Sequence, residues 1–437
     1  MHRSICIVVA AVASGSTWSQ DGGSTDAAVP LREGPLRHTQ LLEVVEGSHL
    51  TFATSARMPS GTSRIEVHRV PLDDEPRSAF LGAPQELLDL RFDVLDSTEP
   101  VQDMSWTWLS EPPWHVLPRG DGWRYVAFDQ KTDRLHVGDP ADGDQETVVD
   151  DVDRLLDTRA VSGRTQCLVA SGNTVELLEI DAERAVRRRR ALVPFEGSHV
   201  NACFPSPLSA SDPRQEALVV SWRDGSLLLQ RVDLRTGAST GSTVPLAPTR
   251  PDVLRVAAWV GDDRARVAVG LPADRQGSKQ ARSTSSRGVG RVAVLAYDAE
   301  QSRVLHESFP PGMTPEDLEG EDKDEVAMMG VDFGTTVTFV ADRDGDSVPD
   351  LAIGAPGWMG GSRLFVLSTE RGRTVTSYRP EEFVAYGACP TVDATGRILF
   401  VMGPCSSYPE LLHSGSIAEL LDLGTGRRLL RLVDGEE

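Results

Sequence analysis

The sequence predicts an all-β protein, and within that class a β-propeller of about seven four-stranded blades. Short strands of alternating apolar and polar residues recur along the 437 residues, separated by turns rich in Gly, Asp and Asn, while helix signals are scarce. In the last third, an apolar strand that ends in Gly-Pro or Gly-x-Pro recurs. Alternation with a period of two is typical of β-strands, and repeated small antiparallel sheets are typical of propellers.

Residues 1–20 predict a signal peptide, and residues 21–40 a flexible segment ahead of the propeller. The apolar run Ile5–Ala13 follows a short charged start, is too short to span a bilayer and leads into small residues that suit cleavage. A first buried strand is the alternative, but the loop-like residues that follow offer it no hairpin partner. We therefore expect an exported protein in the periplasm, at the cell surface or outside the cell. We expect no transmembrane segment elsewhere.

Hairpin patterns fill the first half of the predicted propeller, which we place at residues 41–437. Strand, turn and strand follow one another, with turns of the Asp-Gly or Gly-Asn type, because Gly and Asn tolerate the positive φ angles of tight turns. Such patterns cover residues 63–73, 122–139, 165–183 and 216–237. They resemble one another too weakly to fix the blade borders in this half.

The last third repeats more clearly, at residues 250–310, 326–380 and 385–433. Each unit has a strand, an apolar strand with the Gly-Pro or Gly-x-Pro end, a variable loop and a further strand. Two tandem β-sandwiches are the alternative, with the Pro- and Ser-rich residues 204–214 as their linker. Strands at sandwich spacing do not explain the repeated Gly-Pro ends, so the propeller is favoured.

One unit carries a specific motif. Phe333 and Gly334 precede a strand, the loop "DRDGDSVPD" follows it, and the next strand ends in "GAP" at residues 354–356. This unit resembles the FG-GAP repeat of integrin α-subunit propellers and related bacterial proteins. In that family the D-x-D-G-D-x-x-x-D loop binds Ca²⁺. The resemblance therefore implies a calcium site whose ligands are the side chains of Asp342, Asp344, Asp346 and Asp350 and the carbonyl of Val348.

The chemistry of this loop supports a metal independently. Its four carboxylates repel one another unless the loop curls around a cation; Gly345 supplies a bend, and Pro349 stiffens the exit into the strand. Ca²⁺ takes about six to eight oxygen ligands in irregular geometry, whereas Mg²⁺ resists full dehydration and is the weaker candidate. A solvated acidic turn without metal is the alternative. An EF-hand is excluded, because Ser347 and Ile353 stand where its Gly and Glu belong. All the ligands come from one loop, so the predicted role is structural.

Two related stretches depart from the motif. At the position of the last ligand the preceding repeat has Arg266, a cation where the ion would bind, so we expect that blade to be metal-free. A second acidic stretch, residues 138–146, contains Asp139, Asp142 and Asp144 at a different spacing. We interpret it as a solvated turn rather than a second metal site.

Composition and missing motifs narrow the function classes. The formal net charge of −21 disfavours nucleic acid and anionic lipid as partners, because both are negatively charged. No spacing of His, Ser or Gly indicates a zinc site, a hydrolase elbow or a phosphate-binding loop. The sequence therefore favours a non-catalytic platform that binds a protein or glycan through loops on a rigid scaffold. The alternative is a propeller enzyme, a hydrolase or lyase, with its active site at the central channel.

Other groups of residues have simpler interpretations. The four Cys outside the signal peptide, which include Cys167 and Cys203, either pair, with Cys389 and Cys405 as the preferred disulfide, or stay as buried thiols. The arginine run at 187–190 predicts a solvated strand edge. Four tryptophans suit a sugar-stacking platform, but core packing is favoured for them: Trp106, Trp108, Trp114 and Trp123.

Overall fold

The chain divides into two compact units, residues 1–31 and 32–437, and everything described below belongs to the second. Its described residues are β-strands and turns, and they include no helix long and apolar enough to cross a membrane. The computed structural model describes residues 37–45, 48–57, 63–72, 77–80, 86–92, 114–119, 122–129, 132–139, 146–195, 199–208, 216–246, 254–262, 264–272, 290–297, 302–310, 333–355, 363–378, 391–404 and 416–434.

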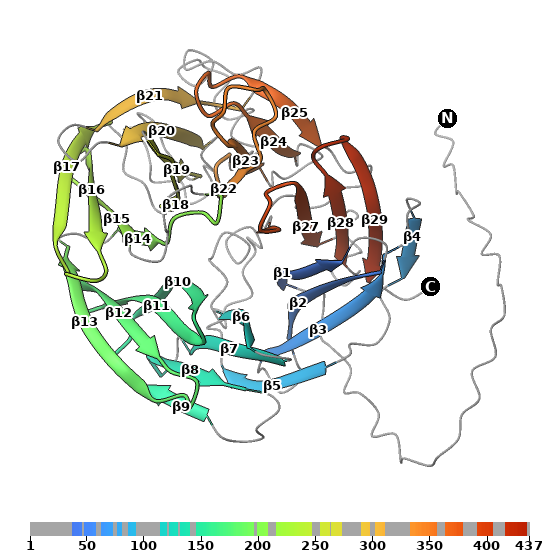
Figure 1. Cartoon of the computed structure of the whole chain (residues 1–437), viewed down its shortest axis with the longest axis horizontal. Helices are drawn as coiled ribbons and strands as arrows, with labels where there is room; N and C mark the ends of the chain where they lie inside the picture. The colour runs from blue at the N-terminus through green and yellow to red at the C-terminus, as the bar shows by residue number, and fades with distance from the viewer. Residues whose placement is uncertain are drawn as a thin grey trace, which may run out of the picture. The chain divides into compact units, whose positions relative to one another are not determined.

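Seven four-stranded antiparallel sheets form the blades of a β-propeller, which confirms the predicted fold class and blade number (Figure 1). Blade 1 contains β1 (Arg37–Val45), β2 (His49–Arg57), β3 (Ser63–Pro71) and β5 (Glu86–Phe92). Blade 2 contains β6 (Trp114–Arg119), β7 (Gly122–Asp129), β8 (Arg134–Gly138) and β9 (Glu146–Val149). Blade 3 contains β10 (Arg154–Val161), β11 (Arg164–Ser171), β12 (Thr174–Ile180) and β13 (Val186–Pro194).

The second half of the chain supplies the remaining blades. Blade 4 contains β14 (Val200–Cys203), β15 (Glu216–Arg223), β16 (Ser226–Asp233) and β17 (Ser239–Pro245). Blade 5 contains β18 (Arg255–Val260), β19 (Ala265–Leu271), β20 (Arg291–Tyr297) and β21 (Arg303–Ser308). Blade 6 contains β22 (Thr336–Val340), β23 (Asp350–Ala355), β24 (Arg363–Leu367) and β25 (Thr374–Tyr378). Blade 7 contains β26 (Thr391–Val392), β27 (Ile398–Pro404), β28 (Ser416–Asp422) and β29 (Arg427–Asp434).

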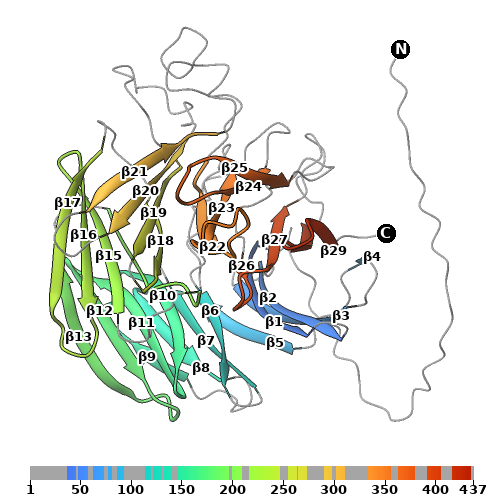
Figure 2. The same cartoon turned by 45° about the horizontal axis from the view of Figure 1, so that its top comes forward.

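The blades close into a ring through their first strands, which are the innermost ones. These strands contact one another in the order β1, β6, β10, β14, β18, β22, β26 and back to β1. An extra strand, β4 (Arg77–Phe80), comes between β3 and β5 in the chain but not in the sheet of blade 1. It pairs in parallel with β29, the outer strand of blade 7 (Figure 2). The first and last blades are therefore joined at the outer edge of the ring as well as at the inner one.

The hydrophobic core lies in the seams between neighbouring blades. At one seam, Ile65 and Val67 of blade 1 pack with Trp114 and Val116 of blade 2, and similar clusters fill the other seams. Because a blade buries both of its faces, the second strands β19 and β23 are buried along their whole length. Apart from Arg266 in β19 and Asp350 at the start of β23, both strands therefore consist of apolar residues and glycine.

The recurring glycine at the strand end has a packing reason. Gly270 ends its strand against the backbone of blade 6, where an added Cβ would lie 2.2 Å from the carbonyl oxygen of Gly334. Gly334 itself has a φ of 90° and donates its N–H to the carbonyl of Gly354 at 3.0 Å. Phe333 is fully buried and stacks edge-on against Phe365, with 5.6 Å between ring centroids. The Phe-Gly pair of one blade thus fits against the glycine of the blade before it.

Polar side chains of the innermost strands bind the backbone of the next blade. The Gln40 amide donates to the Val116 carbonyl and accepts the Val116 N–H, both at 2.8 Å. Arg255 donates from Nε to the carbonyl of Thr335 at 2.9 Å. These bonds satisfy backbone groups at the inner edge that have no strand beside them.

The alternative of two β-sandwiches is wrong, because residues 204–208 follow β14 inside blade 4 and do not link two domains. The first strand begins at Arg37, within the segment that we expected to precede the propeller. The predicted signal peptide at residues 1–20 and the predicted Cys389–Cys405 pair lie outside the described residues. Cys167 and Cys203 are both buried.

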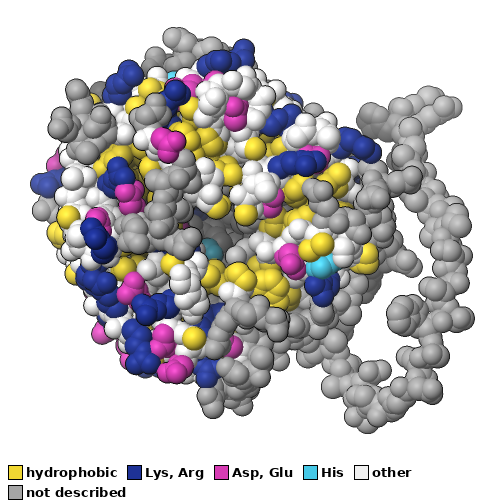
Figure 3. Space-filling view, in the orientation of Figure 1, with side chains coloured by type: hydrophobic (Ala, Val, Ile, Leu, Met, Phe, Trp, Pro, Cys, Tyr) yellow, Lys and Arg dark blue, Asp and Glu magenta, His cyan; other side chains and the backbone are white. Residues whose placement is uncertain are grey.

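The arginine run at 187–190 forms part of β13, the outer strand of blade 3, where much of it is exposed. Its members pair with Asp181, Glu179 and Glu176 and with the carbonyl of Leu234. The predicted solvated strand edge is therefore confirmed. Figure 3 shows the same mixing of charge more widely, with basic and acidic side chains interspersed on the described surface.

Core packing is confirmed for Trp114, whose side chain is buried in the seam between blades 1 and 2. Trp123 is partly buried and packs against the same cluster. Trp106 and Trp108 lie outside the described residues.

Candidate metal centre

The acidic loop, residues 342–349, joins the innermost strand β22 to β23 in blade 6 (Figure 1). Just before it, the Ala341 N–H donates to the carbonyl of Gly396 in blade 7 at 2.9 Å. Within it, Gly345 and Ser347 have φ angles of 78° and 67°. The backbone therefore passes twice through the left-handed region, which Gly adopts without steric cost.

Backbone N–H groups of the loop hold three carboxylates in place. Asp342 accepts two such bonds of 2.8 Å, one on each oxygen. Asp346 accepts one bond of 3.0 Å, and Asp350, the first residue of β23, accepts one of 2.9 Å. The loop is thus curled with its carboxylates turned inward, as the spacing of the four Asp residues predicts.

Three carboxylate oxygens of this loop are buried without a hydrogen-bond partner. They are Asp344 Oδ1, Asp346 Oδ2 and Asp350 Oδ1. The Asp350 side chain is fully buried and that of Asp344 is 3% exposed. Asp342, Asp344 and Asp350 each place a carboxylate oxygen within 4.8 Å of the other two. Buried oxygens without partners are costly, and a hard cation within the converging group would satisfy those of Asp344 and Asp350.

The pKa values of Asp346 and Asp350 reflect their burial first and the repulsion from neighbouring carboxylates second. Burial, followed by the neighbouring carboxylates, raises the pKa of Asp350 to about 7. Burial also raises the pKa of Asp346, and the negative charge of Asp344 adds to the rise. Burial opposes a low pKa at Asp344, but a hydrogen bond from Ser368 and the charge of Arg371 outweigh it and lower the pKa. The pKa values of Asp344 and Asp346 thus shift in opposite directions, because only Asp344 has an arginine beside it.

A turn of the same blade, residues 368–373 between β24 and β25, supports the acidic loop from outside. Arg371 donates to Asp344 Oδ2 at 2.9 Å, and the Thr369 hydroxyl donates to the carbonyl of Pro349 at 2.6 Å. Neither residue was expected from the sequence, because both lie outside the acidic motif. The available signal was the basic character of the turn that closes this repeat.

The predicted ligands are not all placed equally well. Asp342, Asp344 and Asp350 converge, whereas Asp346 is not part of this group of three and accepts the Val348 N–H instead. The Val348 side chain is fully buried in the seam between blades 5 and 6, which anchors the loop there. Ligation by the Val348 carbonyl stays a prediction.

Arg266, at the position that corresponds to the last Asp of the motif, is paired rather than open to an ion. Its Nε donates to Glu370 in the neighbouring blade at 2.5 Å, and its side chain also donates to the carbonyl of Ala265 at 2.9 Å. This ion pair connects blade 5 to the turn that supports the acidic loop.

The prediction of a solvated turn at residues 138–146 is wrong for Asp139. This side chain is buried and accepts a hydrogen bond of 2.9 Å from Arg124 Nε. Arg124 also donates to the carbonyls of Asp181 and Ala182 in blade 3, so the pair fastens two blades. Asp142 and Asp144 lie outside the described residues.

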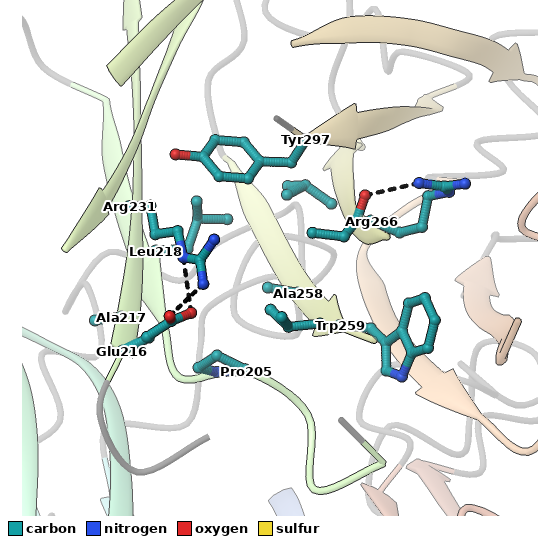
Figure 4. Close-up of a pocket in the computed structure, with 12 residues that line it drawn as sticks. Pro205, Glu216, Ala217, Leu218, Arg231, Ala258, Trp259, Arg266 and Tyr297 are labelled. Atoms are coloured by element: carbon teal, nitrogen blue, oxygen red, sulfur yellow. Dashed lines mark hydrogen bonds and ion pairs between the residues drawn. The ribbon is translucent and has the colours of Figure 1, made fainter. Parts of the chain in front are cut away.

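A small crevice lies between blades 4 and 5 (Figure 4). It is lined by Tyr297, Trp259 and the ion pair of Glu216 with Arg231. Ligand pockets usually keep a few polar groups available for the ligand. Here the two charged groups bind each other and the Trp259 indole donates to the carbonyl of Leu208, so the acidic loop is the stronger candidate site.

No family model matches the chain, and no curated protein matches it. Among solved structures it is similar to the dihydro-haem d1 dehydrogenase NirN in complex with DHE, at 13% identity over 94% of this chain and 76% of that one, with a TM-score of 0.46. It is similar to a Mycobacterium tuberculosis puromycin-hydrolysing peptidase at 14% identity, covering 94% of this chain and 58% of that chain, with a TM-score of 0.46. The β-propeller domain of the trilobed protease from Pyrococcus furiosus gives 9% identity, 91% and 98% coverage and a TM-score of 0.43. These likenesses concern the fold alone. The chain is thus a seven-bladed β-propeller with a candidate metal centre in blade 6.

Proposed function

We propose that the protein is an exported, non-catalytic β-propeller in which a calcium ion stabilises blade 6 and the rigid ring presents a surface that binds a protein or glycan. One observation carries the metal assignment: three buried carboxylate oxygens, on Asp344, Asp346 and Asp350, have no hydrogen-bond partner. Nearly every buried polar atom in a folded protein has a partner, so an ion accounts for them better than a solvated turn does.

Calcium fits this loop better than magnesium. The carboxylates are held by backbone N–H bonds in an irregular loop, and at least three of them converge. Ca²⁺ accepts many oxygen ligands in such irregular sets, whereas Mg²⁺ demands an octahedron and keeps several waters. A weak site, with a dissociation constant on the order of 10⁻⁴ to 10⁻³ M, would suit the calcium concentrations outside the cell.

Two features support the binding role: the scaffold is rigid, and several charged side chains are already engaged in ion pairs. Apolar clusters fill the seams, so loops are presented from a stiff ring. Some charged groups of the kind that enzymes use in catalysis are already paired, Arg124 with Asp139 and Arg231 with Glu216. A negatively charged surface of this size also favours partners other than nucleic acid.

Thermal unfolding with calcium and with chelator tests the structural role of the metal. We expect a higher melting temperature with calcium, and we expect Asp344→Ala to melt like the chelated wild type under both conditions. Equal melting of the wild type in both buffers would refute a structural calcium site. A glycan and protein array probed with the purified chain in calcium then tests the binding role, and hydrolysis or cleavage of an arrayed substrate would support the enzyme alternative instead.

A further inference from the structure

A short segment of blade 4, residues 204–208, reaches over its neighbours; we call it the strap. It leaves the end of β14 and runs towards β22 (Figure 1). At its start, the Phe204 N–H donates to Asp157 Oδ2 at 2.7 Å, and the guanidinium of Arg159 lies 3.9 Å from the centre of the Phe204 ring. Both partners belong to β10, so blade 3 holds this end of the strap.

The middle of the strap binds the innermost strand of blade 5. The Ser206 N–H donates to the carbonyl of Ala258 at 2.7 Å. The Trp259 indole donates to the carbonyl of Leu208 at 3.0 Å. The strap therefore passes along the inner edge of the ring at β18.

The far end of the strap meets blades 6 and 7 beside the acidic loop. The Leu208 side chain packs against the apolar cluster that contains Val348 of the acidic loop. It also lies over Gly396 of blade 7, where an added Cβ would be 2.7 Å from a Leu208 methyl group and 2.7 Å from the Ala341 nitrogen. The Ala341 N–H binds the Gly396 carbonyl at 2.9 Å. Residues from blades 4, 6 and 7 thus share one contact point, directly before the first Asp of the loop.

We propose that the ion of the acidic loop controls the contact of Leu208 with blades 6 and 7. Calcium binding then docks the strap, and calcium removal releases it. This inference rests on the proposed calcium site. Without the ion, the carboxylates repel one another and the loop expands, which moves Val348 and Ala341 away from Leu208 and Gly396. With the ion, both ends of the loop are fixed, and the contact of Leu208 with blades 6 and 7 forms. The metal then fastens several blades rather than one hairpin.

Linkage makes the effect reciprocal: if calcium stabilises the docked strap, the docked strap strengthens calcium binding by the same factor. The inner edge of the ring at β18 would change with calcium as well. A ligand that binds at that edge would therefore depend on calcium without contacting it.

Hydrogen–deuterium exchange of the whole chain tests the proposal, with calcium binding verified by calorimetry on the same sample. In calcium, peptides that cover 204–208 should exchange at least tenfold more slowly than in EGTA. Peptides from β2 and β3 of blade 1, on the far side of the ring, should not change. Calcium binding with unchanged exchange at the strap would overturn this inference and leave the calcium site standing. No calcium binding at all would overturn both.

A pair of variants tests the reciprocal effect. Leu208→Ala should weaken calcium affinity about five- to tenfold, because it removes the contact with Gly396 and with the apolar cluster that contains Val348. Leu429→Ala removes a partly buried leucine at the seam between blades 7 and 1 and should leave calcium affinity within about twofold. Equal calcium affinities in the two variants would contradict the proposal.

Discussion

Replacing Asp350 by Asn probes the charge balance of the acidic loop, because this carboxylate is fully buried and one of its oxygens has no hydrogen-bond partner. Burial and the neighbouring carboxylates raise its pKa from 3.8 to about 7. At about 1.36 kcal/mol per pKa unit, ionising Asp350 in the folded, chelated protein costs about 4 kcal/mol more than in the unfolded chain. Solvent screening near the surface lowers this cost, so we expect about 1–3 kcal/mol.

The pH dependence of the free energy of unfolding follows from the raised pKa of Asp350. The folded chelated protein binds the Asp350 proton more tightly than the unfolded chain, so its free energy of unfolding falls as pH rises from about 4 to about 7. Asn carries no charge and lacks this fall. The variant should therefore match the wild type near pH 4 and exceed its stability by about 1–3 kcal/mol at pH 8 in EGTA. In calcium at pH 8 the order should reverse, because Asn removes a charged ligand.

Urea unfolding followed by tryptophan fluorescence measures these free energies, in EGTA and in calcium, at several pH values. Asp150→Asn is a suitable control, because Asp150 is an exposed carboxylate paired with Arg134. That control should change stability by less than about 0.5 kcal/mol. The reasoning is refuted if Asp350→Asn destabilises the chelated protein at pH 8, or if its advantage over the wild type does not grow with pH.

Further predictions concern packing and charge elsewhere. Gly270→Ala should lower the free energy of unfolding in urea by about 2–4 kcal/mol, because its Cβ would meet the backbone of the next blade. The control Gly241→Ala, whose Cβ would meet atoms no nearer than 3.3 Å, should lower it by under about 1 kcal/mol. Equal losses would contradict the tight seam. Arg397 is the main cause that lowers the pKa of Asp422 to about 2, so the stability from this buried carboxylate is present above about pH 4 and is lost as pH falls towards 2; Asp422→Ala should cost about 2 kcal/mol at pH 7 and clearly less at pH 3, and a cost independent of pH would count against the ion pair. Arg371→Ala should strengthen calcium binding a few-fold in calorimetry, because it removes a cation that competes with calcium for Asp344; weaker binding would refute this competition.

The parts of the structure that the sequence predicts are those whose determinants are close together in the chain. The four Asp residues of the acidic loop lie within nine positions, and the convergence of three of them, Asp342, Asp344 and Asp350, follows from this close spacing. Hairpins are local for the same reason: "RDG" between β15 and β16 places Asp224 and Gly225 at φ angles of 49° and 80°. Counting outward from the repeats of the last third predicts about seven blades, as the structure has them.

The parts that could not be predicted depend on contacts between distant segments. Asp139 looks like a solvated turn residue, but its partner Arg124 lies on another strand and is held by carbonyls of blade 3. Leu208 sits in a Pro- and Ser-rich loop, and nothing near it indicates that it packs against Gly396. The parallel pairing of β4 with β29 joins residues about 350 positions apart, and a four-residue strand carries no signal of its partner.

Calorimetric titration of the chelated, purified chain with Ca²⁺ tests the central claim most directly. We expect one calcium site, in the acidic loop, with a dissociation constant on the order of 10⁻⁴ to 10⁻³ M or lower. Mg²⁺ should bind more weakly, and Asp344→Ala should lose the site. Absence of calcium binding by the wild type, or unchanged binding by Asp344→Ala, would contradict it.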